Sequence, residues 1–294
     1  MRTKSGGIGI EAVSHIRPDG TLVRQEVPAM LNMTMVRVTE ADARAAAMSP
    51  LRIANSIAAE GPAIDPFRLT DLTIVARDKA FPPATYLPAS PRQEVLDQPD
   101  RSALVRIRRP LAPGPAPQLP IADLEVAQYL QPTETAQSDN PEILKTARDI
   151  VGDEKDAWRA AQKLSDWVFR RMVKVESQPK PVTALEVLHS MKGDCTEHAI
   201  LLATLARAVG LPSKFVTGVV YKGGAFYYHA WTKLYVGTWV DVDPAWGETS
   251  LNVGHVEIAS GSLDNLSMAR MNLATGRTIG SLQLQIKDWS PHLN

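Results

Sequence analysis

A change of hydrophobic periodicity constrains the fold of this chain more than any other feature. Between Cys195 and Val209, apolar residues recur every three to four positions, which is typical of a helix with one buried face. From Lys214 to Val242 the chain consists of β-type runs rich in Val, Tyr, Phe and Trp. A helix followed by successive strands, without alternating β and α units, predicts an α+β fold with an antiparallel sheet.

The predicted sheet has three central strands joined by glycine-containing turns. Lys222-Gly223-Gly224 supplies a hairpin turn, and Gly237 separates the second strand from the third. The strands are expected at Lys214–Tyr221, Ala225–Val236 and Thr238–Val242.

The only cysteine of the chain stands at the start of the predicted helix. Asp194 is a good N-cap, and Glu197, three residues further on, completes an acidic capping box. Cys195 is then the first helical residue, where unpaired N–H groups and the helix dipole favour an anion. The two neighbouring acids oppose this effect, so a nearby imidazolium would have to outweigh them. Cys195 is therefore a candidate nucleophile, although a lone cysteine is more often a small buried residue.

His229 and Asp243 are the candidate partners of Cys195. His229 lies within the second predicted strand, and Asp243 precedes a proline at the end of the third. Taken alone, His229 would be a hydrogen-bonded, half-buried residue and Asp243 an ordinary turn residue. Together with the thiol they supply a nucleophile, an acid/base group and an orienting carboxylate.

These residues carry a resemblance to a known family. The runs GDCTEHA, RAVGLPS and YYHAWTKLYVGTWVDVDPAW resemble the catalytic core of the transglutaminase-like superfamily, above all its bacterial members, many of which are assigned as cysteine proteases. The family pattern has a Gly-x-Cys that opens a helix, a His-Ala-Trp strand, and an Asp before Pro-Thr. The resemblance implies a papain-like α+β core, with Cys195 as nucleophile, His229 as acid/base and Asp243 as its orienting group. The motif match is specific over residues 183–258.

The sequence departs from the family pattern at one position, where Ala245 replaces the usual threonine. Asp241 offers a second carboxylate two residues away on the same strand face, but the Asp-Pro match favours Asp243.

Two further histidines and a possible metal site offer alternative interpretations. His198, one turn from Cys195, could approach the thiol, but a hydrogen-bonded helix residue is its commoner role. By the same resemblance, His255 is expected to support the sheet. Cys195, His198 and His229 would offer zinc ligands, but the spacing is weak and no second Cys or His pair supports it. No metal site is expected, and no cofactor, since no loop has the pattern of a phosphate or calcium site.

The chain is expected to divide into three parts. Residues 1–120 form a β-rich accessory region, which would belong to a larger amino-terminal β domain if the chain is a fragment. Residues 121–140 form a linker, and residues 141–294 form the transglutaminase-like core with a carboxy-terminal strand extension. In the first part, strands are expected at Ile8–Ile16, Leu22–Met30, Leu72–Ala76 and Leu104–Arg108. A short helix or crossing loop is expected at Thr39–Met48. No regular structure is expected at Phe81–Gln98, and an extended segment is expected at Arg109–Pro120. In the core, further helices are expected at Pro141–Ile150, Asp153–Met172 and Thr183–His189, and further strands at Leu251–Ile258 and Leu282–Trp289.

Composition excludes several classes of function. The 32 basic and 32 acidic residues cancel, so no charge bias indicates nucleic acid or a membrane surface as a partner. The longest apolar run, Ala199–Leu211, is too short to span a membrane. One cysteine excludes an intrachain disulfide and leaves the compartment open. Without a signal-peptide pattern the chain would be cytoplasmic, or periplasmic if it is a fragment of an exported protein.

The sequence therefore predicts acyl transfer from a protein or peptide amide through a thioester intermediate. Hydrolysis is the expected outcome, because water is always present and crosslinking needs a dedicated path for an amine. Protein-glutamine γ-glutamyl transfer is the alternative, and a non-catalytic protein-binding module is a second one. Retention of all three candidate residues favours catalysis over the module. The substrate, the side-chain oxyanion donor and the oligomeric state stay open.

Overall fold

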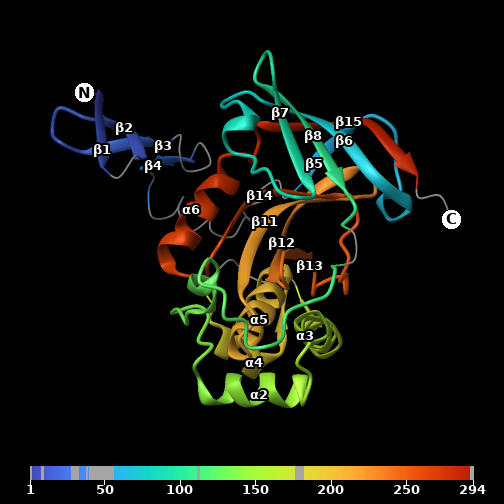
Figure 1. Cartoon of the computed structure of the whole chain (residues 1–294). Helices are drawn as coiled ribbons and strands as arrows, with labels where there is room; N and C mark the ends of the chain where they lie inside the picture. The colour runs from blue at the N-terminus through green and yellow to red at the C-terminus, as the bar shows by residue number, and fades with distance from the viewer. Residues whose placement is uncertain are drawn as a thin grey trace.

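The computed structural model of the protein describes residues 2–7, 10–27, 33–37, 39, 56–110, 113–175 and 182–291. A four-stranded antiparallel sheet at the amino terminus contains β1 (Arg2–Gly7), β2 (Ile10–Ile16), β3 (Leu22–Val27) and β4 (Met33–Val36) (Figure 1). It includes the predicted amino-terminal hairpin as β2 and β3. The predicted helix or crossing loop at Thr39–Met48 lies outside the described residues, apart from Thr39 itself.

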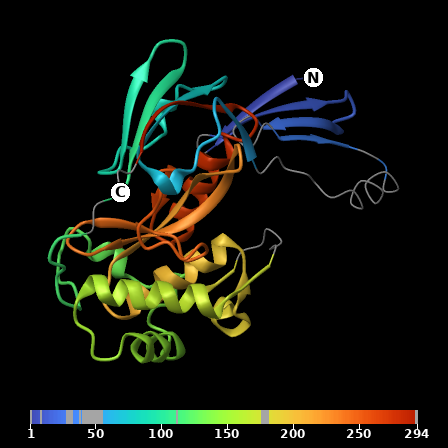
Figure 2. The same cartoon turned by 90° about the vertical axis from the view of Figure 1, so that its right-hand side faces the viewer.

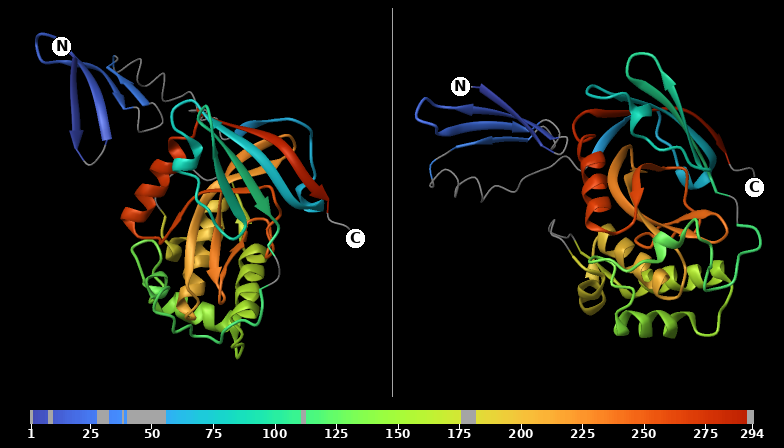
Figure 3. Two further views of the ribbon diagram at one scale, coloured as in Figure 1. Left: turned by 45° about the horizontal axis from the view of Figure 1, so that its top comes forward. Right: turned by 60° about the vertical axis from the view of Figure 1, so that its left-hand side comes forward.

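A nine-stranded sheet contains most of the other described strands. In spatial order its strands are β14 (His255–Gly261), β11 (Ser213–Lys222), β12 (Ala225–Tyr235), β5 (Ser56–Glu60), β15 (Leu282–Pro291), β6 (Leu69–Asp78), β8 (Ser102–Arg108) and β7 (Gln93–Gln98), with β13 (Trp239–Val242) paired to the second half of β12. All neighbours run antiparallel except β15 and β5. Figure 3 shows β15, in red, among the blue and cyan strands of the amino-terminal half. The expected α+β class and antiparallel sheet are confirmed.

The three central strands agree closely with the sequence prediction. β11 and β12 pair over their whole length, with Gly218 opposite His229. A side chain at Gly218 could not fit, because its Cβ would lie 2.2 Å from a carbonyl oxygen of β14 and 2.6 Å from the ring of Trp231. This glycine therefore allows Trp231 to lie flat beneath the neighbouring strand, close to His229.

Among the described α-helices, the first four along the chain gather on one side of β11, β12 and β13, whereas the last one lies apart from them, against β14 and β11 (Figures 1 and 2). They are α2 (Pro141–Val151), α3 (Ala157–Arg171), α4 (Ala184–Ser190), α5 (Cys195–Ala208) and α6 (Asn265–Gly276). The central helix α5 contacts β12 on one side and α2, α3 and α4 on the other. Its fully buried leucines, Leu201, Leu202 and Leu205, each contribute about 2 kcal/mol of hydrophobic stabilisation. This burial holds α5 rigidly against the sheet.

The predictions of helices α2, α4 and α5 are confirmed, and the predicted start of α3 was wrong. Asp153 was expected to cap the second core helix, but α3 begins at Ala157 with Asp156 as N-cap. The reason is that the Glu154 side chain accepts hydrogen bonds from the amides of Lys155 and Asp156 and forms a turn before the helix. Helix α6 was not predicted from the sequence.

Two short segments near the sheet edge differ from the prediction or extend it. The segment Phe81–Gln98, expected to lack regular structure, contains the 3₁₀ turn η2 (Pro83–Thr85) and strand β7. Its prolines end before β7 starts, so they leave the ladder with β8 intact. In Arg109–Pro120 the described residues form only an isolated bridge between Gln118 and Asp156, as expected of an extended segment.

Hydrogen bonds cross the expected boundary at residue 120. Strand β5 pairs with β12, and Arg92 bonds to carbonyls beyond residue 250. One hydrophobic core lies between the helices and the sheet, and a second lies between β11, β12 and β14 and the strands β5, β6, β8 and β15. The division into accessory region, linker and core remains a prediction. Over the described residues, no helix is both long and apolar enough to cross a membrane.

Candidate active site

The start of α5 has the geometry that its sequence predicts. Asp194 Oδ1 accepts a hydrogen bond from the Thr196 amide at 2.8 Å, and Glu197 Oε2 accepts one from the Asp194 amide at 2.8 Å. Gly193 makes room for this capping box, because a Cβ there would lie 2.3 Å from the Cβ of Glu197. Cys195 is thus the first residue of α5, and it is a free, half-buried cysteine.

The structure brings Cys195, His229 and Asp243 together. His229 Nε2 lies 2.7 Å from Asp243 Oδ2, and the two side chains are 7% and 0% exposed. The thiol of Cys195 lies close enough to the His229 ring to contribute to the raised pKa of that ring. Since Nε2 faces Asp243, Nδ1 is the ring nitrogen left for the thiol. The imidazole therefore stands between the sulfur and the carboxylate.

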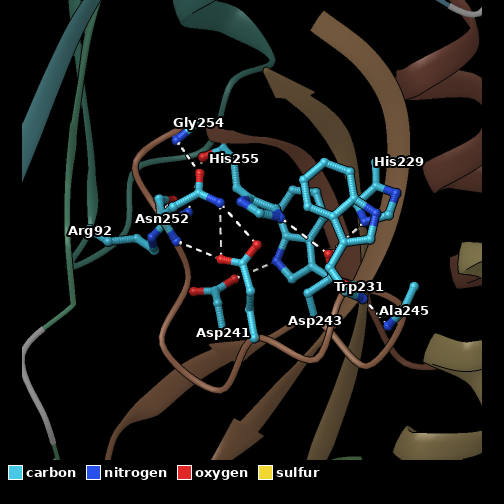
Figure 4. Close-up of polar contacts among 11 residues, drawn as sticks. Arg92, His229, Trp231, Asp241, Asp243, Ala245, Asn252, Gly254 and His255 are labelled. Atoms are coloured by element: carbon cyan, nitrogen blue, oxygen red, sulfur yellow. Dashed lines mark hydrogen bonds and ion pairs between the residues drawn. The ribbon is translucent and has the colours of Figure 1, made fainter. Parts of the chain in front are cut away.

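Asp243 is fixed by donors on both of its oxygens (Figure 4). Oδ1 accepts from the amides of Ala245 at 2.8 Å and Trp246 at 3.2 Å, which is an Asx turn formed around the proline. Oδ2 accepts from His229 and also from His255 Nε2 at 3.3 Å. The sequence assigned His255 to the support of the sheet, whereas its ring lies in the site, against Asp243.

These contacts determine the protonation states of Asp243 and His229. Burial would raise the pKa of Asp243, but hydrogen bonds from His229 and His255, and the charges of these rings, hold it well below its ordinary value. Burial would lower the pKa of His229, but Asp243 and Cys195 outweigh this effect and raise it to about 10. At neutral pH His229 is therefore an imidazolium beside the thiol, and Asp243 is a carboxylate.

Asp241, the other candidate carboxylate in the sequence, contacts Trp231 instead of His229. Its Oδ1 accepts a hydrogen bond from Trp231 Nε1 at 2.7 Å. The Trp231 ring lies with its centroid 6.3 Å from that of His229 and 5.4 Å from that of His255. Asp241 therefore positions the indole that packs against both imidazoles, and Asp243 alone contacts His229.

A buried arginine that the sequence did not indicate holds the loop around His255 (Figure 4). Arg92 donates from Nη1 to the His255 carbonyl at 3.0 Å and from Nη2 to the Asn252 carbonyl at 2.8 Å. Asn252 in turn donates to Glu248 and accepts from the Gly254 amide. Burial lowers the pKa of Arg92, while nearby acids oppose the shift. The loop from residue 252 to residue 255 is thus fixed by a side chain 160 residues away.

His198 does not join the candidate triad. Its Nδ1 lies 2.6 Å from the Asp194 carbonyl, and its buried Nε2 has no hydrogen-bond partner among the described residues. Burial lowers its pKa, so the ring is neutral. It is a hydrogen-bonded helix residue, which is the role that the sequence favoured.

The site contains a group of possible metal ligands, but it differs from the zinc set weighed in the sequence. Nitrogen atoms of His229 and His255 and a carboxylate oxygen of Asp243 lie within 4.8 Å of one another. Cys195 and His198 are not part of this group. The same atoms form the hydrogen bonds described above, so an ion here would compete with them.

Comparison with known proteins identifies the part of the chain that holds this site. Residues 144–244 match the family model of the transglutaminase-like superfamily. This segment is similar to a transglutaminase-like core. It includes Cys195, His229 and Asp243, but not His255 or Arg92.

Two solved structures are similar to the chain at low sequence identity. A "putative cysteine protease" from Cytophaga hutchinsonii is 16% identical, with a TM-score of 0.50, over 77% of this chain and 90% of that chain. The periplasmic domain of TgpA from Pseudomonas aeruginosa is also 16% identical, with a TM-score of 0.42, over 67% of this chain and 74% of that chain. At this identity the first of these supports the fold alone. No curated protein sequence matches the chain significantly.

Proposed function

We propose that the protein is a cysteine hydrolase that cleaves amide bonds of peptides or proteins through a thioester. The supporting observation is that a buried His229 contacts both Cys195, at the start of a helix, and the ionised Asp243. A thiolate, an imidazolium and an orienting carboxylate in this order form a cysteine nucleophile system.

In the acylation step the Cys195 thiolate attacks the amide carbonyl carbon and a C–S bond forms. The negative charge moves to the carbonyl oxygen, where the N–H of Cys195 can donate, since a first helical residue has no carbonyl partner within its helix. His229 then gives its proton to the amide nitrogen, the C–N bond breaks and the amine or ammonia leaves. A thioester and a neutral imidazole remain.

In the deacylation step His229 accepts a proton from water as the water oxygen attacks the thioester carbonyl. The C–S bond breaks, a carboxylic acid is released, and the thiolate and imidazolium are restored. Asp243 stays ionised throughout and keeps the Nε2–H of the ring directed towards itself. If a lysine amine replaced water, the same steps would produce a crosslink.

The decisive experiment is a screen of peptide and glutamine amides with the wild-type protein and Cys195→Ala. Wild type should release amine or ammonia, and the variant should lose all of this activity. His189→Gln serves as control, because His189 is an exposed histidine on α4 paired with Glu142. Activity retained by Cys195→Ala would exclude Cys195 as the nucleophile.

Two measurements separate the alternatives. Ammonia release measured with and without an added primary amine distinguishes hydrolysis from crosslinking, because only a crosslinking enzyme incorporates the amine. Alkylation of the single cysteine by iodoacetamide at neutral pH distinguishes an enzyme from a binding module. We expect His229→Ala to slow alkylation at least tenfold, and equal rates would support the module.

A further inference from the structure

A pocket of about 540 Å³ opens beside the candidate site. It is lined by a loop before β6, the end of α3, the β11–β12 turn and the chain after Asp243. The lining residues are Ile64, Asp65, Pro66, Phe67, Phe169, Lys174, Tyr221, Lys222, Gly223, Trp246 and Glu248.

The pocket borders the candidate triad from two sides. Trp246 lines it and also packs against His229, with ring centroids 5.2 Å apart. Lys174 lines it from β9 (Val173–Lys174), which pairs with β10 (Lys192–Gly193), the strand that leads directly into Cys195. The charge of Lys174 also reaches His198 in the first turn of α5. A molecule in this pocket would therefore contact Trp246, the ring that packs against His229.

Aromatic rings form the wall of the pocket. Phe67 is 51% exposed and Phe169 is 38% exposed, although both are large apolar residues. Phe169 packs against the backbone after Trp246, where a Cβ on Gly247 would lie 2.9 Å from the ring and the φ angle is +72°. Flat rings that stay partly open to solvent next to a reactive group are suited to stacking with an aromatic side chain.

Two lysines line the pocket. Lys174 Nζ lies 5.3 Å from the Phe169 ring centroid, and Lys222 Nζ lies 5.8 Å from that of Trp246. Among the described residues, neither forms an ion pair within 4.0 Å.

The two carboxylates that line the pocket have other partners. Asp65 contacts Arg68 and the Phe67 amide. Glu248 accepts hydrogen bonds from Asn252. The lysine charges are therefore available to an anionic group on a ligand.

We propose that this pocket selects the substrate, and that it takes an aromatic side chain of a peptide next to an acidic residue. The aromatic ring stacks between Phe169 and Trp246, and the carboxylate pairs with Lys174 or Lys222. This assignment rests on the proposed amide chemistry, since it places the scissile bond at Cys195. Peptides with basic residues at the same position would be repelled by the two lysines.

The test uses binding rather than turnover, so that it does not depend on the chemistry. Cys195→Ala is titrated by calorimetry with the peptide acetyl-Phe-Asp-Gln-Gly-amide and with versions that carry Ala for Phe, Asn for Asp, or both. We expect the Phe peptides to bind at least tenfold more tightly than the Ala peptides. Asp should add about threefold over Asn, and added salt should remove that gain.

Matched variants connect the preferences to the pocket. In the Cys195→Ala background, Phe169→Ala should abolish the preference for Phe, whereas Phe81→Ala should not, because the exposed Phe81 stacks on Arg277 outside the pocket. A double change of Lys174 and Lys222 to Met should abolish the preference for Asp, whereas Lys145→Met on α2 should leave it.

The outcomes separate this inference from the proposed function. The inference would be overturned if no peptide bound, if all peptides bound equally, or if peptides with aliphatic or basic residues bound more tightly. Cleavage of any amide by the wild-type protein would still support the hydrolase. A preference for Phe and Asp that depends on these residues, in a protein that cleaves nothing, would support the pocket and contradict the hydrolase.

Discussion

Both oxygens of Asp243 are occupied by donors, and the two histidines share one of them. His229 lies 2.7 Å from Oδ2 and His255 lies 3.3 Å from the same atom. Each donor stabilises the ionised carboxylate. We infer that His255 is a positioning residue, which keeps Asp243 charged and aimed at His229.

The first prediction concerns His255→Phe, which removes the donor to Asp243. A hydrogen bond to a charged group contributes about 1.5–3 kcal/mol, so kcat/KM for an amide substrate should fall at least tenfold. The acid limb of the activity against pH should also move to higher pH, because one of the donors that lower the pKa of Asp243 is lost. His189→Phe is the control for the same chemical change at an exposed histidine. An unchanged acid limb would mean that His255 has only a packing role.

The second prediction concerns pH and His229. Its pKa in the folded protein is about 10, above the ordinary value of 6.5. The extra stability is therefore complete below pH 6.5 and is lost as the pH rises towards 10, at up to about 1.4 kcal/mol per pH unit. Urea unfolding of wild type between pH 7 and pH 10 should show this decline. His229→Gln, which does not titrate, should show a flatter profile, and equal slopes would contradict the assignment.

At the scale of elements, the first turn of α5 connects folding to reactivity. Asp194 and Glu197 satisfy the free amides there, and so they fix the backbone that presents Cys195. Helix α3 has a comparable N-cap, Asp156, whose side chain accepts from the Arg159 amide at 2.9 Å.

The third prediction compares these two caps. Asp194→Ala and Asp156→Ala should each reduce the free energy of unfolding by about 1 kcal/mol. Only Asp194→Ala should change the rate at which iodoacetamide alkylates the single cysteine, since only that cap touches the site. Equal alkylation rates in the two variants would show that the cap has no influence on the thiol.

Elements with local signals could be predicted from the sequence. Asp194, Pro141 and Thr183 mark helix starts that the structure confirms, because caps act within a single turn. Helix α6 escaped prediction because it shows little apolar periodicity, with only Met271 fully buried. Strand β5, with the sequence SIAAE, is stabilised by partners on either side rather than by its own residues.

The candidate triad could be predicted because its three residues lie in one stretch with a familiar pattern. His255 and Arg92 could not be assigned, since their roles depend on contacts with residues distant in the sequence or on another element. Nothing in the residues around Arg92 indicates that its guanidinium binds carbonyls 160 positions later.

At the scale of the whole molecule, Arg92 connects the outer strands to the site. Its guanidinium is buried among Asp241, Glu257 and Glu248, whose charges oppose the loss of its proton. Lys233, the other buried cation of this region, bonds to Glu257 and lies near Asp241. The interior between β7 and the central strands therefore holds two cations, Arg92 and Lys233, among three carboxylates.

The fourth prediction is that Arg92→Ala destabilises the protein strongly. Removing one member of a buried charge group costs about 3–5 kcal/mol, and the loop that carries His255 would lose two hydrogen bonds. Arg92→Lys keeps the charge but not the fork of donors. Its free energy of unfolding should lie between those of Arg92→Ala and wild type. The measurement is urea unfolding at pH 7, and a loss below about 1 kcal/mol would contradict the role given to this residue.

The position of β15 has a consequence for how the protein is made. Among the described strands it comes last along the chain, yet it inserts between β5 and β6 and joins the amino-terminal strands to the central ones. During synthesis, β5 and β6 cannot pair with β15 until the ribosome has released the segment after Leu282. Nascent chains stalled before that point should expose the open edges of β5 and β6 to chaperones and proteases, and full-length chains should be protected.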